Sequence, residues 1–259
     1  MVLWIADVDG VFTDFRARPS ERVIFLSARI GAREPFGYVT GRGASWLSRN
    51  LMPTLTEAYT QSPPRLGLVC AEYGGIILRW QDGEWHKERN PQFSALDDLR
   101  AYLRSRIASV TGVFFDEEKE VMISVEARHD LRAADHGGVE KGLQIAEQIL
   151  QEQVENYPEL EYQRTTYCCD LVPKGMNKAF GASYILAHVT DVPTHVYLLG
   201  DARSDLLLAD PIRSRHIPYT MYFVGEEALL PSDVRKQYVI EGSSKKYVEG
   251  TAEILQHFL

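Results

Sequence analysis

Short apolar runs recur along the chain, and each ends in a polar or glycine-rich turn. The runs at residues 2–6, 37–39 and 196–199 are too short for helices, so we expect buried strands there. Residues 66–69 and 219–224 are weaker candidates for the same sheet. Helical patterns follow the turns, and the order strand, turn, helix is typical of a parallel sheet. The outer parts of the chain therefore predict an α/β fold.

The middle of the chain follows a different pattern, in which helix, strand, strand occurs twice. Residues 75–85 first predict a hairpin, and a helix then begins with Ser94 as the expected N-cap and Asp97 completing a capping box. Apolar residues at helical spacing support this helix and a second one, namely Leu96, Leu99, Leu103 and Ile107, then Val139, Leu143, Ala146, Leu150 and Val154. The expected strands are residues 113–115, 121–127, 160–164 and 167–171.

Such an antiparallel α+β module, placed between two halves of a parallel domain, predicts an insertion. We expect a Rossmann-like parallel-sheet core formed by residues 1–79 and 173–259, with an inserted α+β cap domain at residues 80–172. The last stretch, residues 248–259, is predicted to be a helix that closes the core.

The composition is that of a globular protein, with 45% apolar and 25% charged residues. Lysine and arginine number 28 and aspartate and glutamate 36, so the net charge of −8 argues against nucleic acid or an acidic membrane as the main partner. Three cysteines without C-x-x-C spacing argue against a disulfide scaffold or a cysteine zinc site. Asp7 and Asp9 interrupt the first apolar run, so no signal peptide is expected. We expect a cytoplasmic protein that is a monomer or a small homo-oligomer.

Two acidic turns follow two of the predicted strands. Asp7 and Asp9 come after the first strand, and Asp201 and Asp205 follow the strand at 196–199. Ligands of parallel sheets bind beyond the carboxyl ends of the strands, so we expect these side chains at one edge. Carboxylates gathered there repel one another unless a cation lies between them, and all-oxygen ligands suit Mg²⁺. Each turn taken alone is equally typical of a solvated acidic turn that caps the next element.

Two further segments offer groups that can bind an anion. Thr40, Gly41 and Arg42 follow the second predicted strand and precede a helical pattern, so their hydroxyl and N–H groups can hold phosphate oxygens, with a plain helix cap as the alternative. A dinucleotide-binding motif needs a third glycine where Trp46 stands. Lys178 opens a helical pattern, a place that the helix dipole disfavours for a lysine unless it faces an anion or a carboxylate.

In their order and spacing, these four segments resemble the four motifs of the haloacid dehalogenase superfamily of phosphohydrolases. The resemblance implies a nucleophile at Asp7 and a general acid/base at Asp9, with Lys178 as the lysine of the third motif. It also implies phosphate binding by Asp7, Thr40, Gly41 and Lys178, and Mg²⁺ binding by Asp7, Asp9, Asp201 and Asp205.

The residues Cys70-Ala71-Glu72-Tyr73-Gly74-Gly75 resemble the glutamate-asparagine-glycine turn of the subfamily with a type IIB cap. Sucrose-phosphate, mannosyl-3-phosphoglycerate and trehalose-phosphate phosphatases share this plan. The chain departs from the pattern at three places: Tyr73 stands where asparagine is usual, Val11 where threonine is common, and Ser204 where asparagine often precedes the second aspartate.

The resemblance implies a Mg²⁺-dependent phosphomonoester hydrolase that forms an aspartyl-phosphate and acts on a sugar phosphate or a related small phosphorylated metabolite. A sugar phosphomutase of the same fold and a non-catalytic sugar-phosphate-binding regulator are the alternatives. Candidates for contacts with the substrate are Arg42, Glu72, Arg128 and His129. For Arg128 and His129 the alternative is an exposed basic end of a strand.

Overall fold

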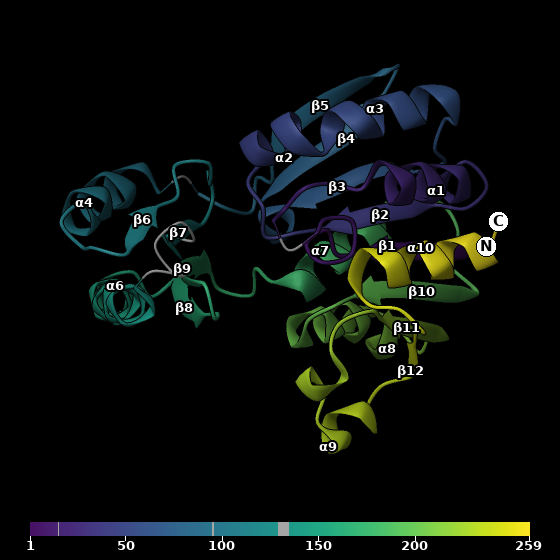
Figure 1. The fold of residues 1–259 in the computed structure, drawn as a ribbon. Coiled ribbons are helices and arrows are strands. Elements are labelled where there is room, and N and C mark those ends of the chain that lie inside the picture. Colours follow the sequence, from purple (N-terminus) through teal and green to yellow (C-terminus); the bar gives the residue numbers. More distant parts are fainter. Residues whose placement is uncertain (15, 95, 129–134) are drawn as a thin grey trace. The chain divides into compact units, whose positions relative to one another are not determined.

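The computed structural model describes residues 1–14, 16–94, 96–128 and 135–259. They form two compact units: a core unit of Met1–Glu88 and Asn177–Leu259, and an insert of Arg89–Met176 (Figure 1). The predicted class, an α/β core with an inserted α+β unit, is confirmed. No helix within the described ranges is long and apolar enough to cross a membrane.

An eight-stranded sheet forms the centre of the core unit, in the order β12-β11-β10-β1-β2-β3-β4-β5. Its strands are β1 (Val2–Ala6), β2 (Phe36–Val39), β3 (Gly67–Ala71), β4 (Ile76–Gln81), β5 (Glu84–Arg89), β10 (His195–Gly200), β11 (Tyr219–Phe223) and β12 (Ile240–Gly242). The first six strands in this order, from β12 through β1 to β3, are parallel to one another, and β4 is antiparallel to β3. The five strands expected from short apolar runs are all confirmed.

The sheet grows in two directions from β1. Strands β2 and β3 lie on one side of it, and β10, β11 and β12 lie on the other. Val2 pairs with His195 of β10, and Trp4 pairs with Phe36 of β2. Loops after neighbouring strands diverge where the strand order reverses, which leaves a crevice for ligands. Here the strand order reverses between β1 and β10, so their carboxyl ends are the expected place for a ligand.

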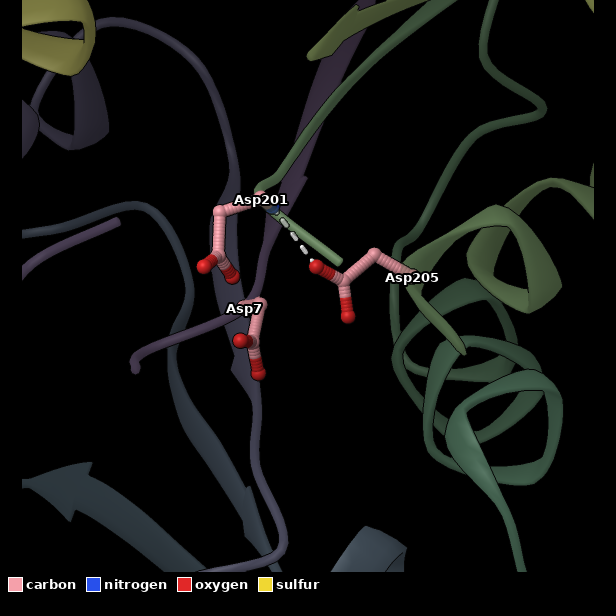
Figure 2. A group of neighbouring side chains, drawn as sticks. All are labelled: Asp7, Asp201 and Asp205. Atoms are coloured by element: carbon pink, nitrogen blue, oxygen red, sulfur yellow. Dashed lines mark hydrogen bonds between the residues drawn. The ribbon is translucent and has the colours of Figure 1, made fainter. Parts of the chain in front are cut away.

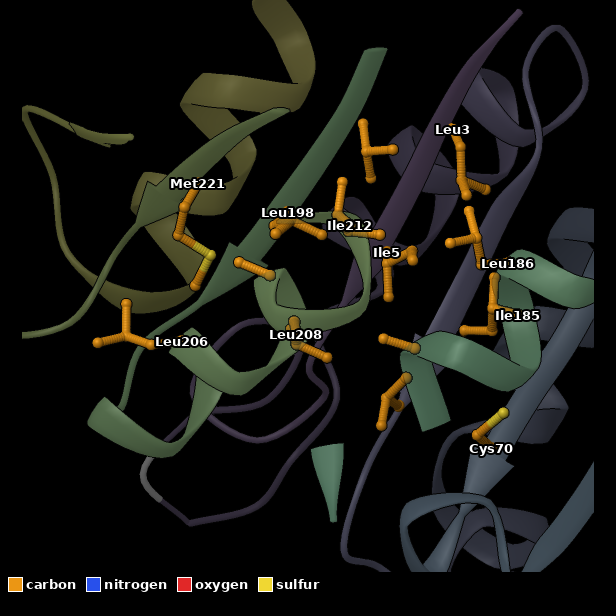
Figure 3. Close-up of a cluster of buried hydrophobic side chains, with 14 of the residues drawn as sticks. Leu3, Ile5, Cys70, Ile185, Leu186, Leu198, Leu206, Leu208, Ile212 and Met221 are labelled. Carbon is orange, nitrogen blue, oxygen red and sulfur yellow. The ribbon is translucent and has the colours of Figure 1, made fainter. Parts of the chain in front are cut away.

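Helices cover both faces of this sheet. Their bounds are α1 (Glu21–Gly31), α2 (Ala44–Asn50), α3 (Met52–Gln61), α7 (Lys178–Ala187), α8 (Asp210–Ser214), α9 (Ser232–Arg235) and α10 (Tyr247–His257), with the 3₁₀ turns η1 (Glu72–Gly74), η2 (Arg203–Ala209) and η3 (Glu227–Leu229). On one face Leu3 and Ile5 pack with buried aliphatic side chains of α7, η2 and α8 (Figure 3). On the other face Trp4 stacks on Phe36 and meets Phe258 edge-on. Because successive side chains of β1 point to opposite faces of the sheet, this strand contributes to the apolar packing on both faces.

The insert has a four-stranded antiparallel sheet in the order β6-β7-β9-β8. Its elements are α4 (Asp97–Ile107), β6 (Val113–Phe115), β7 (Ile123–Ala127), α6 (His136–Asn156), β8 (Leu160–Arg164) and β9 (Cys168–Pro173). The helix-strand-strand repeat is confirmed. The apolar residues expected on the two helices lie in one buried cluster with residues of the sheet, except Val154, which is partly buried and packs against that cluster. The expected cap is wrong: Leu96, not Ser94, precedes α4, and Asp97 and Asp98 occupy the first turn, where carboxylates favour the helix dipole.

The chain passes between the two units a few residues later than the sequence predicts. The hairpin of β4 and β5 turns at Asp82 and Gly83, which have φ of 54° and 86°. Because β4 pairs with β3, this hairpin extends the core sheet instead of beginning the insert. On the return, the core unit resumes at Asn177 rather than at residue 173.

Candidate active site

Three aspartates meet in the core unit at the carboxyl ends of β1 and β10 (Figure 2). Asp7 follows β1, Asp201 follows β10, and Asp205 lies in η2. One carboxylate oxygen from each of the three lies within 4.8 Å of the others. Asp7 and Asp205 are buried, and Asp201 is partly buried. The two acidic turns expected from the sequence thus converge on one point.

Asp205 fixes the loop that carries Asp201. Its Oδ2 accepts hydrogen bonds from the N–H of Asp201 at 2.7 Å and of Ala202 at 2.9 Å, the first of which is drawn in Figure 2. Gly10 completes the approach from the other side, because it has a φ of +71° and a Cβ there would lie 2.1 Å from Asp201 Oδ2. Only glycine combines that conformation with that proximity.

Lys178 balances part of the negative charge. Its Nζ lies 2.9 Å from Asp7 Oδ1, and it also donates to Asp205 Oδ1. The lysine is buried at the first position of α7, where the Asn177 side chain caps the helix by accepting from the N–H of Ala179 and Phe180. Burial alone would lower the pKa of Lys178, but Asp205 and Asp7 outweigh it and raise that pKa, so the ammonium stays charged. The expectation that this lysine faces a carboxylate is confirmed.

Burial and mutual repulsion disfavour the simultaneous ionisation of the three carboxyl groups. Burial raises the pKa of Asp7 well above its ordinary value; Lys178 opposes this, while Asp205, Asp9 and Asp201 add to it. Burial, followed by the charge of Asp205, raises the pKa of Asp201 to about 7. A divalent cation relieves such repulsion, and a set of carboxylate oxygens is the donor type that Mg²⁺ prefers. The residues present therefore fit the metal that the resemblance implies.

Asp9 lies outside this group of three carboxylates. Its two oxygens face Arg42, with Arg42 Nε at 3.1 Å from each and Nη2 at 2.9 Å from Oδ1. The guanidinium also lies over the ring of Trp46, at 4.8 Å from the centroid. The structure thus brings the Asp9 side chain to Arg42, and the metal binding by Asp9 that the resemblance implies stays a prediction.

The loop of residues 40–42 follows β2, next to β1 in the sheet, and it is tied to the turn after β3. Thr40 Oγ1 accepts from the N–H of Arg42 at 3.1 Å. The N–H groups of Glu72 and Tyr73 donate to the carbonyls of Arg42 and Thr40, at 3.1 and 2.9 Å. Thr40 and Glu72 are fully buried. The candidate phosphate loop and Glu72 therefore form one hydrogen-bonded assembly beside Asp9.

The other two candidate substrate residues belong to the insert. Arg128 is exposed just after β7, where its N–H donates to the carbonyl of Gly112 at 2.9 Å. His129 lies outside the described residues. A role for either in substrate binding stays a prediction.

Sequence reasoning missed two supporting contacts. Asn177 before a helical pattern is a recognisable N-cap signal, since asparagine is among the residues preferred there. The pairing of Arg42 with Asp9 has no local signal, because the two residues are 33 positions apart in different loops.

No protein-family model and no curated protein matches this sequence. Solved structures match it over nearly its whole length. A trehalose-6-phosphate phosphatase C-terminal domain from C. albicans has a TM-score of 0.66 at 15% identity, covering 99% of this chain and 91% of its own. A haloacid dehalogenase-like hydrolase from Bacteroides thetaiotaomicron has a TM-score of 0.64 at 15% identity, with 99% of both chains covered.

A third match is the sucrose-phosphatase from Synechocystis sp., solved in complex with sucrose and phosphate. Its TM-score is 0.58 at 15% identity, covering 99% of this chain and 97% of its own. At 15% sequence identity, these matches establish that the folds are similar. The fold implied by the four sequence motifs is confirmed: the chain has the fold of the haloacid dehalogenase-like hydrolases.

Proposed function

We propose that this protein is a Mg²⁺-dependent phosphatase that releases phosphate from a small phosphorylated sugar or a related metabolite. The observation that carries the proposal is the contact between Asp7 and Lys178 inside a group of three carboxylates at the carboxyl edge of the sheet. A buried carboxylate held by an ammonium is a fixed nucleophile. The similarity in fold to a trehalose-6-phosphate phosphatase and to a sucrose-phosphatase supports a sugar phosphate as substrate.

In the proposed reaction, Asp7 attacks phosphorus and forms an aspartyl-phosphate, which splits one difficult displacement into two easier ones. Lys178 orients the Asp7 carboxylate and favours its ionised form against the effect of burial, and it balances charge on the phosphoryl oxygens during transfer. Thr40 and the N–H of Gly41 bind those oxygens from the loop after β2. Each of these groups acts on the phosphoryl group, which all phosphomonoesters share.

Asp7, Asp201 and Asp205 are the residues that would hold Mg²⁺. When bound, the ion supplies positive charge that offsets repulsion between the carboxylates and an anionic substrate. Asp205 also accepts hydrogen bonds from the N–H groups of Asp201 and Ala202. In this way it holds the loop that positions Asp201 for metal binding.

Asp9 acts as the general acid and base in this proposal. It donates a proton to the leaving alcohol, and it then takes a proton from the water that hydrolyses the aspartyl-phosphate. Arg42 contacts both Asp9 oxygens and so fixes the direction of the side chain. For the first step Asp9 takes a proton from solvent on one oxygen and keeps the hydrogen bond from Arg42 on the other. The insert, which includes Arg128 and His129, is proposed to recognise the leaving alcohol, because the groups of the core unit read only the phosphate.

The test is phosphate release by the purified protein with Mg²⁺ from a panel of sugar phosphates and p-nitrophenyl phosphate. We expect Asp7→Asn to lose several orders of magnitude in turnover, because the covalent nucleophile is gone. Asp14→Asn is the matched control, since Asp14 binds Arg18 outside the group of three carboxylates and should keep wild-type turnover. Rapid quenching followed by mass spectrometry should find a phosphorylated peptide that contains Asp7. Near-normal turnover by Asp7→Asn would contradict the mechanism.

A further inference from the structure

The turn after β3 has an unusual backbone. Glu72, Tyr73 and Gly74 all have positive φ, at 46°, 58° and 102°. For residues with a side chain this left-handed region is disfavoured, because Cβ crowds the following carbonyl. Two such residues in succession persist only where the surroundings hold them, and strain of this kind gathers at functional sites.

The surroundings that hold Tyr73 are elements of the proposed phosphate site. Its N–H donates to the carbonyl of Thr40 at 2.9 Å, which ties it to the loop after β2. Its carbonyl faces Gly181 in the first turns of α7, where a Cβ would lie 3.1 Å from that oxygen. The backbone of Tyr73 is therefore fixed between the Thr40 loop and the helix that begins at Lys178.

The side chain of Tyr73 covers Gly41. A Cβ at Gly41 would lie 2.9 Å from the Tyr73 hydroxyl oxygen and 3.0 Å from the ring carbon that bears it. The phenol thus occupies the space that a side chain at position 41 would need, and its hydroxyl lies against the loop that is proposed to bind phosphate. The phenol also lies close enough to the Lys178 ammonium for the two groups to interact electrostatically.

We propose that the Tyr73 hydroxyl donates a hydrogen bond to an oxygen of the bound phosphoryl group. This inference rests on the proposed function and extends it, because it adds a phosphate ligand at a position where the resembling family usually has asparagine. A neutral phenol donating to an anionic oxygen forms a charge-assisted hydrogen bond. Because it contacts phosphate and not the leaving alcohol, Tyr73 acts equally on every phosphomonoester.

The experiment compares wild type with Tyr73→Phe, using inorganic phosphate in the presence of Mg²⁺ as the probe and calorimetry as the readout. We expect phosphate to bind about tenfold more weakly to the variant, the loss typical of one hydrogen bond to a charged group. The value of kcat/KM should fall by a similar factor for p-nitrophenyl phosphate and for the best sugar phosphate. The ring still covers Gly41, so the thermal unfolding midpoint should not change.

Tyr184→Phe is the matched control. Tyr184 lies on α7, is also half-buried, and donates its hydroxyl to Glu88 at 3.2 Å, so its loss should leave phosphate affinity at the wild-type value. Affinity is measured well below both unfolding midpoints, so a less stable variant still gives an answer.

Unchanged phosphate affinity in Tyr73→Phe would overturn the inference while leaving the proposed function intact, provided that wild type releases phosphate. A wild-type protein that neither binds phosphate nor hydrolyses any ester would overturn both.

Discussion

Arg42 holds Asp9 through both carboxylate oxygens, with its Nε 3.1 Å from each and its Nη2 2.9 Å from Oδ1. The aspartate follows β1 and the arginine follows β2, so the pair joins two neighbouring loops at the carboxyl edge of the sheet. A guanidinium bound to both oxygens restricts the direction of the carboxylate far more than one bond does. Arg42 is thereby a positioning residue for the proposed acid and base.

We expect Arg42→Ala to lower kcat about 10- to 100-fold for a phosphate ester of an aliphatic alcohol, because a misdirected Asp9 protonates the leaving oxygen poorly. The loss should be several-fold smaller for p-nitrophenyl phosphate, whose leaving group needs little protonation. Steady-state kinetics on both substrates measures the difference, with Arg49→Ala on the exposed side of α2 as control. Equal losses on the two esters would mean that Arg42 binds phosphate instead.

Removal of the metal should abolish turnover. With EDTA present, Asp7, Asp201 and Asp205 repel one another and the substrate, so phosphate release should fall to background and return when Mg²⁺ is added in excess. Mg²⁺ should also raise the thermal unfolding midpoint, since a ligand that binds the folded state stabilises it. In Asp201→Asn the Mg²⁺ concentration for half-maximal stabilisation should rise at least about tenfold. Asp210→Asn, on α8, should behave as wild type; activity that survives exhaustive EDTA treatment would refute the metal requirement.

Lys178→Met should destabilise the protein by about 3–5 kcal/mol, because it leaves the buried carboxylates of Asp7 and Asp205 without their cation. Urea unfolding measures the loss, and Lys174→Met, which removes an exposed lysine, is the control. The double variant Lys178→Met, Asp7→Asn should recover part of it, since one stranded charge is gone. If the two substitutions add without recovery, the ion pair contributes nothing to stability.

Asp170, on β9 of the insert, should make stability depend on pH. Burial raises its pKa, while the Ser124 hydroxyl and the charge of Lys119 act in the opposite direction. The folded protein thus holds this proton more tightly than the unfolded chain, whose carboxyl titrates near 3.8. The free energy of unfolding must therefore fall as the pH rises from about 4 through the raised pKa.

We expect Asp170→Asn to gain stability relative to wild type over this pH range, because the amide cannot ionise. Urea unfolding at a series of pH values from 4 to 8, with Mg²⁺ saturating, isolates the difference. Glu159→Gln, an exposed change in the same unit, should run parallel to wild type. A constant gap between wild type and Asp170→Asn at every pH would contradict the expectation.

The parts that the sequence predicts are those whose signal is local. The strand at 2–6 is a continuous apolar run, and the acidic turns directly follow strands, so the meeting of Asp7 with Asp201 follows from the parallel order. The pair of Asp9 and Arg42 could not be predicted, because the two side chains are 33 positions apart and the pattern of neither loop indicates a contact with the other. The same holds for the β4–β5 hairpin, whose place in the core unit is decided by the pairing of β4 with β3.

The two junctions of the insert are unequal in what they permit. The outgoing one lies in β5, an edge strand separated from β1 by β2, β3 and β4, so added or deleted residues there are remote from Asp7. The returning one lies between Met176 and Asn177, one residue before Lys178, and the Asn177 side chain caps α7. A chimera that receives a foreign insert must therefore keep its splice ahead of Asn177, whereas the outgoing splice can slide along the hairpin. Exchange of the insert on this scaffold therefore tolerates a change in chain length at the outgoing junction, whereas the returning junction must keep its register with α7.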